Sequence, residues 1–203
     1  LNLQHLQRQL EDNPENVMEL KPVIESTAGN IIEQIESLNR IASDFSKFAK
    51  PVQNQLQPVN LNRVLESVSE LYGNDPEISV TLSQPDFPVA ILAAEDELRR
   101  AFINLVKNGI EAHDTEIAEI SISVELRGDQ VLILFHDSGT GIAPETQDKI
   151  FVPNFSTKSS GTGLGLAITK KIIEAHNAEI WFESRPGEGS TFFISIPAMN
   201  RDV

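Results

Sequence analysis

Residues 120–137 have the sequence ISISVELRGDQVLILFHD, in which two apolar stretches flank a Gly-Asp pair. Apolar residues that alternate with polar ones are typical of a strand with one buried face, and a Gly-Asp pair between two such stretches is typical of a tight turn. This segment therefore predicts two antiparallel strands joined by a hairpin.

Further helices and strands are predicted around this hairpin. Apolar residues recur at helical spacing over residues 61–72, 95–113 and 164–176, whereas residues 78–82 alternate and FPVAILA (87–93) suggests another strand. EIWFES and STFFISIP predict a last hairpin across a Pro-Gly-Glu-Gly turn. The pattern predicts an α+β fold, a two-layer α/β sandwich with helices on one face of a mixed, mostly antiparallel sheet.

The N-terminal part has a different period. Apolar residues recur in alternating steps of four and three, as in a heptad seam on a long helix: Ile24, Ala28, Ile31, Ile35, Leu38, Ala42, Phe45 and Ala49. Leu1–Leu10 is a shorter helical arm, and Glu11–Pro22 contains residues that break helices. Residues 1–52 are thus expected to form an antiparallel helical hairpin, followed by the linker Pro51–Asn60 and a second domain over 53–203.

A lone hairpin leaves much of its apolar seam uncovered, which predicts a homodimer through the hairpin. The alternative is that the seam packs on the rest of its own chain.

Composition argues against several classes of protein. The net charge of −14 is unsuited to neutralising a phosphate backbone, so no nucleic-acid partner is expected. The 203 residues include no cysteine and no apolar run of membrane-spanning length. Because the first residue is Leu1, we expect a fragment from the cytoplasm, whose full-length protein reaches the inner membrane only through a missing upstream segment.

A glycine-rich stretch, STKSSGTGLGLAITKKI (156–172), precedes the last predicted helix. It lacks the Lys-Ser or Lys-Thr of a phosphate loop, and no strand leads directly into it as a dinucleotide fingerprint requires. Open backbone at a helix start still suits an anionic ligand.

Polar residues in three preceding segments suggest the same ligand. Asn104, Asn108 and Glu111 share one helical stripe and offer oxygen ligands suited to Mg²⁺, although a solvated face is the alternative. Asp137 ends a strand before glycines and can accept a hydrogen bond from a base amino group, although a simple turn has the same pattern. IFVPNFSTK ends in Lys158, a cation for phosphate.

NLVKNGIEA, DSGTGI, IFVPNFSTK and GTGLGLAI, in this order, resemble the four ATP-binding boxes of bacterial sensor histidine kinases. These kinases belong to a superfamily with gyrase, MutL and the large heat-shock chaperones. The helical hairpin resembles the dimerisation region of the nitrogen-regulation type of sensor kinase. The resemblance implies ATP and Mg²⁺ as cofactors, and phosphoryl transfer to a histidine and then to a response regulator receiver domain.

Residue roles follow from the resemblance. Asn108 corresponds to the Mg²⁺ ligand, with Asn104 beside it and Lys107 reaching phosphate. Asp137 corresponds to the adenine reader. The remaining residues implied in nucleotide binding are Gly139, Gly141, Ile142, Lys158, Gly161, Thr162, Gly163, Leu164, Gly165, Leu166 and Thr191. One departure is Gly109, which stands where alanine is usual.

A second departure concerns the phosphate acceptor. His5 lies on the predicted hairpin but is followed by Leu6 rather than an acidic residue, and His113, His136 and His176 are better explained structurally. The acceptor segment is therefore expected to be missing from this fragment. Two alternatives remain: an ATP-driven conformational clamp of the gyrase or MutL type, and a non-catalytic nucleotide-binding scaffold.

Overall fold

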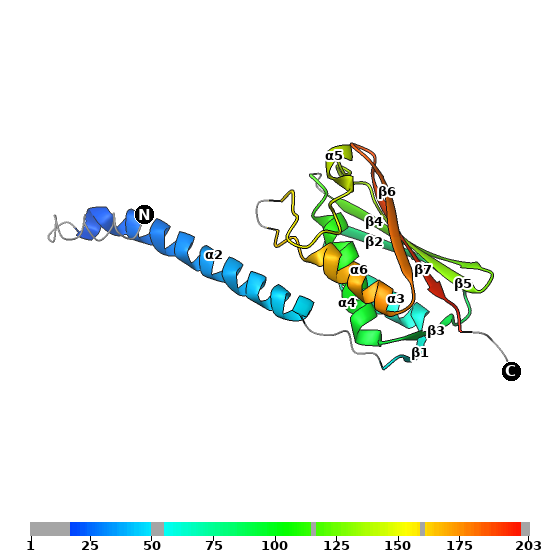
Figure 1. Cartoon of the computed structure of the whole chain (residues 1–203). Helices are drawn as coiled ribbons and strands as arrows, with labels where there is room; N and C mark the ends of the chain where they lie inside the picture. Colours follow the sequence, from blue (N-terminus) through cyan, green and yellow to red (C-terminus); the bar gives the residue numbers. More distant parts are fainter. Residues whose placement is uncertain (1–16, 50–54, 115–116, 159–160, 200–203) are drawn as a thin grey trace. The chain divides into compact units, whose positions relative to one another are not determined.

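A five-stranded sheet forms one layer of the larger structural unit (Figure 1). The computed structural model describes residues 17–49, 55–114, 117–158 and 161–199, and the chain divides into two units between Lys47 and Phe48. The sheet belongs to the second unit. The division predicted at residues 52/53 falls beside residues outside the described part, so it stays a prediction.

The strand order in the sheet is β2-β4-β5-β7-β6. Only β2 and β4 run parallel, and the other neighbouring strands are antiparallel. Gly128 and Asp129 form the predicted turn between β4 and β5. The bounds are β2 Ile78–Ser83, β4 Ala118–Arg127, β5 Gln130–Asp137, β6 Glu179–Arg185 and β7 Gly189–Pro197. The prediction of a mixed, mostly antiparallel sheet is confirmed.

Three helices, α3 (Leu61–Glu70), α4 (Glu95–Ile110) and α6 (Gly165–Ala175), cover one face of this sheet (Figure 1). Alternate strand residues supply the buried face beneath them, including Ile120, Ile122, Val131, Ile133, Ile194 and Ile196. Because a strand's side chains alternate between its two faces, the remaining positions point to the side without helices. A short helix, α5 (Pro144–Gln147), lies in the loop after β5.

Helix α4 lies at the centre of the helical layer. Its first turn carries three carboxylates, Glu95, Asp96 and Glu97, and their negative charges interact favourably with the positive N-terminal end of the helix dipole. Its buried stripe repeats at helical spacing: Leu98, Ala101, Phe102, Leu105, Val106 and Gly109. Phe102 packs against Phe135 of β5 with ring centroids 5.3 Å apart. This stripe holds α4 against the sheet and leaves its polar stripe available for a site.

The predicted linker Pro51–Asn60 is wrong over its last four residues. Gln57–Asn60 forms strand β1, which pairs antiparallel with β3 (Ala90–Ala93) in a separate two-stranded sheet. Pro58 is tolerated there because a strand with one neighbour has a free edge. Val59 is buried in the core. The partner strand lies some thirty positions away in the sequence, so the local composition did not indicate it.

Helix α2, Val17–Ala49, lies in the first unit up to Lys47 and confirms the long helix predicted from the heptad seam. The predicted helix-breaking connection through Pro22 is wrong from Val17 onward, because Pro22 lies inside α2. A proline near a helix start removes a single backbone bond, here the one to the carbonyl of Met18, and the rest of this long helix is unaffected. Residues 1–16 lie outside the described part, so the short arm and the hairpin stay predictions. None of the described helices has the length and apolarity of a membrane span.

Candidate nucleotide-binding site

Asp137 is a buried carboxylate at the end of β5, with a side chain only 5% exposed. The backbone N–H of Gly139 donates to its Oδ1 at 3.0 Å. Burial raises the pKa of Asp137, and hydrogen bonds from the backbone of Gly139 and Ser190 and the nearby charges of His113 and His136 lower it in part. A carboxylate has about four lone-pair positions, so it can accept a further hydrogen bond from a ligand.

The histidines near Asp137 have structural partners. The backbone N–H of Glu119 donates to Nε2 of His113 at 3.3 Å, which assigns the proton to Nδ1, where it is donated to the carbonyl of Gly109 at 2.8 Å. His136 contacts the hydroxyl of Thr191 at 3.0 Å. These contacts agree with the structural interpretation of both histidines.

His176 is buried at the end of α6. Its Nε2 accepts a hydrogen bond from the backbone N–H of Ala94 at 3.0 Å, and its Nδ1 lies 2.7 Å from the carbonyl of Ile172. The ring thus joins the end of α6 to the start of α4, which is a structural role. His5 lies outside the described residues.

The polar stripe of α4 has two different asparagines. Asn104 donates from Nδ2 to the hydroxyl of Thr169 at 2.9 Å and so ties α4 to α6. Asn108 lies one turn later, and its Nδ2 is buried with no hydrogen-bond partner among the described residues. A buried polar atom without a partner is costly and is usually explained by a ligand or water. Asn108 is therefore the side chain on this stripe that is available to a ligand.

The residues present fit a magnesium site made mainly of amide oxygens. No group of three or more His, Cys, Asp or Glu side chains within the described residues could hold a metal ion. Mg²⁺ usually keeps several waters and binds through few protein oxygens plus phosphates. The amide oxygens of Asn108 and Asn104 would be the ligands in such a set, while the unpartnered Nδ2 of Asn108 is a donor and suits a phosphate oxygen.

Helix α6 begins against α4. A β-carbon at Gly165 would lie 2.6 Å from Oδ1 of Asn104, so a larger residue there would displace the Asn104 side chain. Leu164 caps the helix without a side-chain hydrogen bond. The free backbone N–H groups and the dipole at a helix start favour a phosphate. The arrangement therefore places the start of α6 beside the asparagines of α4.

The loop after Asp137 packs against the turn between β6 and β7. Gly141 has φ +70°, and a β-carbon there would lie 2.1 Å from the carbonyl oxygen of Arg185. The backbone N–H of Ile142 donates to the hydroxyl of Ser184 at 2.8 Å. Gly139 lies against Ala112, just past the end of α4. These contacts fix the position of the loop that follows Asp137.

The predicted nucleotide-binding residues of the glycine loop, 161–166, differ in their burial and in their contacts. Gly163 has φ +66°, and its carbonyl accepts from the backbone N–H of Asn154 at 3.0 Å. Gly161 lies beside Ser156, and Thr162 is half-buried. Leu164 is buried and Leu166 packs against the core. The loop therefore folds back on residues 154–158 before α6 starts.

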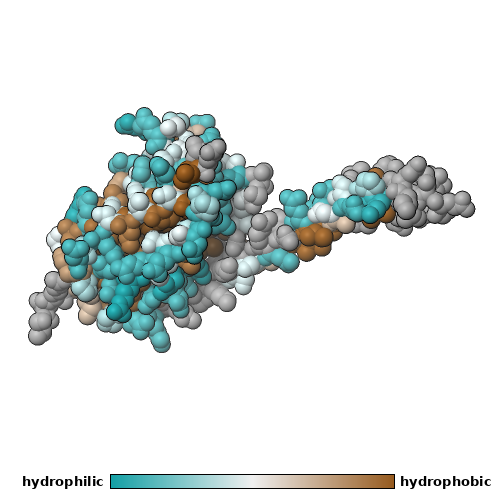
Figure 2. Space-filling model, turned by 180° about the vertical axis from the view of Figure 1, so that it is seen from behind, coloured by the Kyte–Doolittle hydropathy of each residue, from teal (hydrophilic) through white to brown (hydrophobic). Residues whose placement is uncertain are grey.

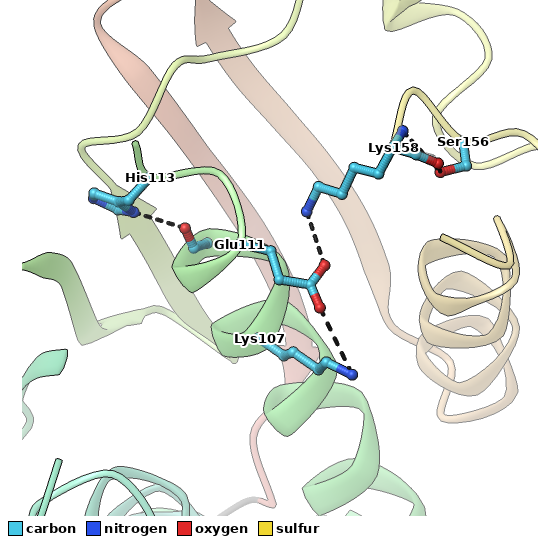
Figure 3. A network of polar contacts seen from close by, with 6 residues as sticks. Lys107, Glu111, His113, Ser156 and Lys158 are labelled. Atoms are coloured by element: carbon cyan, nitrogen blue, oxygen red, sulfur yellow. Dashed lines mark hydrogen bonds and ion pairs between the residues drawn. The ribbon is translucent and has the colours of Figure 1, made fainter. Parts of the chain in front are cut away.

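Two lysines meet one carboxylate at the end of α4 (Figure 3). Nζ of Lys158 lies 2.9 Å from Oε2 of Glu111, and Nζ of Lys107 lies 3.7 Å from Oε1 of the same residue. Ser156 contacts the backbone of Lys158 at 3.1 Å. Glu111, one turn beyond Asn108, thus brings both predicted phosphate-binding cations to one place.

Thr191 does not lie where its predicted role requires. Its side chain points to the helix-free face, where it contacts His136, whereas Asp137 points to the helical layer. Ser190 is the residue paired with Asp137 in the sheet, and it is buried with its hydroxyl 3.0 Å from that of Ser184. Sequence analysis missed Ser190. Strand alternation could have found it, because neighbouring residues of a strand point to opposite faces.

Gly109, which departs from the expected alanine, lies at the closest approach of α4 to Asp137. A β-carbon there would lie 3.1 Å from Cβ of Asp137 and 2.6 Å from Cδ1 of Ile120. The glycine therefore lets the helix carrying Asn104 and Asn108 pack close to the strand carrying Asp137.

Comparison with known proteins gives a family match. A family model described as "Histidine kinase-, DNA gyrase B-, and HSP90-like ATPase" matches residues 93–200. The chain is 36% identical over 173 residues to the sensor histidine kinase ZraS of Salmonella typhimurium, an alignment that covers 83% of this chain and 37% of ZraS. The chain therefore spans less than half the length of this relative.

Solved structures show the same fold. The catalytic domain of histidine kinase ThkA matches with a TM-score of 0.63 and 34% identity, over 70% of this chain and 95% of that domain. Histidine kinase ThkA in complex with response regulator protein TrrA matches with a TM-score of 0.70 over 99% of this chain and 61% of that chain; at 24% identity it shows the fold alone. The predicted sandwich and the resemblance to sensor histidine kinases are confirmed, whereas the resemblance to the nitrogen-regulation type stays a prediction.

Proposed function

Because the chain belongs to the family of histidine kinase-, DNA gyrase B- and HSP90-like ATPases, we propose that it is the ATP-binding kinase region of a sensor histidine kinase. The observation that carries this proposal is the position of α4. Gly109 of α4 lies against Asp137, and Asn104 of the same helix lies against Gly165. Asp137 and the start of α6, which are far apart in the sequence, thus both pack against α4, as an elongated ligand with a base and phosphates requires.

In this proposal the two ends of the site have different tasks. Asp137 accepts a hydrogen bond from the adenine amino group, and the start of α6 donates backbone N–H groups to the phosphates. Asn108, with Asn104 beside it, would hold Mg²⁺, which when bound neutralises phosphate charge. Lys107 and Lys158 add positive charge at the same end. Phosphoryl transfer depends mainly on positioning and charge neutralisation, which these groups supply.

Calorimetry with a non-hydrolysable ATP analogue, with and without Mg²⁺, tests the proposal. We expect heat of binding that is larger in Mg²⁺. Absence of heat at millimolar analogue would contradict the proposed site.

The phosphate acceptor is proposed to be a histidine outside this chain. His113 and His176 have both ring nitrogens engaged, and His136 faces the side of the sheet without helices. Incubation with labelled ATP should leave this chain unlabelled, while a version extended upstream through an acceptor helix should gain acid-labile label. Acid-labile label on His5 would contradict this.

The proposed homodimer rests on the apolar seam of α2. Ile35, Leu38 and Phe45 of the seam are each more than half exposed. Exposed apolar residues in a row favour a partner, which we propose is α2 of a second copy. Light scattering of the whole chain and of residues 53–203 tests it. If the whole chain and residues 53–203 are both monomeric, the proposal is contradicted.

The downstream partner is proposed to be a response regulator receiver domain, and the expected compartment is the cytoplasm. ThkA, a fold neighbour, has been solved with the response regulator protein TrrA. The test is transfer of label from the phosphorylated, extended protein to a purified receiver domain. Retention of the label in the presence of several such domains would contradict this partner class.

A clamp that hydrolyses ATP, the alternative, needs a general base for water. Glu111 is the nearest candidate carboxylate beyond Asn108, but it contacts Lys158 and Lys107. Both oxygens of the Glu111 carboxylate are thus engaged by lysine side chains rather than free to contact an attacking water. This contact favours the kinase over the clamp.

A further inference from the structure

The helix-free face of the sheet carries an apolar patch formed by Trp181, Phe193 and Leu134. Trp181 pairs with Phe193, and Phe193 pairs with Leu134, across three neighbouring strands. Leu132 lies two residues before Leu134 on the same side of β5, and it is buried although it lies outside the main core. Figure 2, the view from behind, shows hydrophobic surface bordered by hydrophilic side chains on this unit.

The two aromatic rings of the patch form a flat surface. The rings of Trp181 and Phe193 are stacked, with centroids 5.3 Å apart and planes 7° from parallel. Trp181 lies on β6, the edge strand of the sheet, and is 39% exposed. Aromatic residues are enriched at protein interfaces, because a stacked ring supplies much contact area with little loss of side-chain freedom.

Carboxylates border this patch. Glu179 and Glu183 lie two residues before and after Trp181, so they point to the same side of β6. Glu125 of β4 pairs with Leu132 in the sheet. Glu125 has an ion pair with Arg127, whereas Glu179 and Glu183 have none with any described residue. The patch is therefore apolar at its centre and negatively charged at its edge beside Trp181.

We propose that this patch, Trp181, Phe193 and Leu134 with Glu179 and Glu183 at its edge, docks a cationic protein segment that also carries apolar side chains. A lysine or arginine can lie over the indole face and reach either glutamate, since Trp is the best cation–π partner. The apolar side chains of such a segment cover Phe193 and Leu134. Rim charges then set partner choice and association rate.

Charge decides between the possible occupants. A second copy would bring the same carboxylates onto this face, and nucleic acid or an anionic membrane would bring phosphates, so each would meet like charge. A cationic segment is attracted instead. Because Asp137 and Asn108 lie on the helical side of the sheet, the inference does not depend on the proposed nucleotide site.

Trp181 is the only tryptophan of the chain, so its fluorescence reports on this patch directly. The probe is a short peptide with lysines and phenylalanines in a glycine–serine background, titrated into the whole chain at low and high salt. We expect the Trp181 emission to shift to shorter wavelength and the affinity to fall as salt rises. The same peptide with glutamate in place of lysine should give no shift.

Two matched double variants locate the binding. The double variant Glu179→Gln, Glu183→Gln should bind the peptide about three- to tenfold more weakly, because two exposed charge contacts are lost. Glu70→Gln with Glu174→Gln makes the same change of net charge on α3 and α6, on the helical side, and should leave the affinity unchanged. Phe193→Ala should also weaken binding.

Several results would overturn the proposal. These are no shift with the lysine peptide, equal weakening by both double variants, and an equal response to the glutamate peptide. A shift with anionic vesicles or with an oligosaccharide, but not with the lysine peptide, would assign the patch to another class of ligand.

Discussion

Nζ of Lys158 lies 2.9 Å from Oε2 of Glu111, which joins the loop before the glycine run to the end of α4. Lys107 lies 3.7 Å from the other oxygen of the same carboxylate. These side chains are between 37% and 66% exposed, so each ion pair is weak. Glu111 thus pairs loosely with both cations that we propose for the phosphates, and in the proposed complex it would compete with the phosphates for them.

Glu111→Gln should therefore raise the affinity for a non-hydrolysable ATP analogue by about two- to fivefold, the range expected for a weak surface ion pair. Calorimetry measures this. Glu174→Gln, which removes the partner of Lys170 at the far end of α6, is the control and should have no effect. Weaker binding by Glu111→Gln would show that the carboxylate positions the lysines instead.

Asp137→Asn should weaken binding of the ATP analogue by roughly 1–3 kcal/mol, because the buried base amino group loses its charged acceptor. The melting temperature at neutral pH should stay the same or rise, because burying the charged carboxylate of Asp137 is unfavourable, as its raised pKa shows, and the amide carries no charge. Asp129→Asn, an exposed change in the β4–β5 turn, should alter neither quantity. Full binding by Asp137→Asn would exclude it as the base reader.

The affinity for the analogue should fall on acidification at a pH above the usual range of an aspartate. The reason is that burial raises the pKa of Asp137, and the protonated form cannot accept in the same way. The effect on stability has the opposite sign. The folded state binds this proton more tightly, so the group favours folding below the ordinary Asp pKa, and this contribution is lost as pH rises through the folded pKa.

Calorimetry over a pH series measures this change, and Asp137→Asn should lack it. An identical pH profile in the variant would contradict the assignment.

Asn108→Ala and Asn104→Ala should separate ligand binding from stability. Asn108→Ala should lower analogue affinity mainly in the presence of Mg²⁺ and leave stability nearly unchanged, because its Nδ2 has no partner among the described residues. Asn104→Ala should cost about 1 kcal/mol of stability, because its bond to Thr169 is lost. Urea unfolding and calorimetry with Mg²⁺ or EDTA measure both. Equal losses with and without Mg²⁺ would contradict Asn108 as a metal ligand.

Gly141→Ala should destabilise more than Gly187→Ala. Both glycines have positive φ, +70° and +78°, which costs an alanine roughly 1–2 kcal/mol. A β-carbon at Gly141 would in addition meet the carbonyl of Arg185 at 2.1 Å, whereas at Gly187 nothing lies within 4 Å. Urea unfolding should show the larger loss for Gly141→Ala, with weaker analogue binding, because the loop after Asp137 must move. Equal losses would show that the loop yields easily.

The strands and helices with a clear apolar period were predictable from sequence. β4, β5 and α4 form where alternation or helical spacing indicated, because burying one face of each element requires that pattern. β1 was missed, because Pro58 and its polar neighbours pair with a strand distant in the sequence. The helix break predicted at Pro22 was wrong, because a proline that removes one backbone hydrogen bond does not end a long helix.

By itself the sequence determined the fold class, the family and the candidate residues of the site, since local periodicity and four ordered motifs are properties of neighbouring residues. Only the tertiary structure decided how these residues are used. It paired Asn104 with Thr169 and left Asn108 without a partner, it joined Glu111 to Lys158, and it set Ser190 rather than Thr191 beside Asp137. The reason is physical: the partner of a polar side chain depends on which distant segments pack against it, and local sequence does not contain that information.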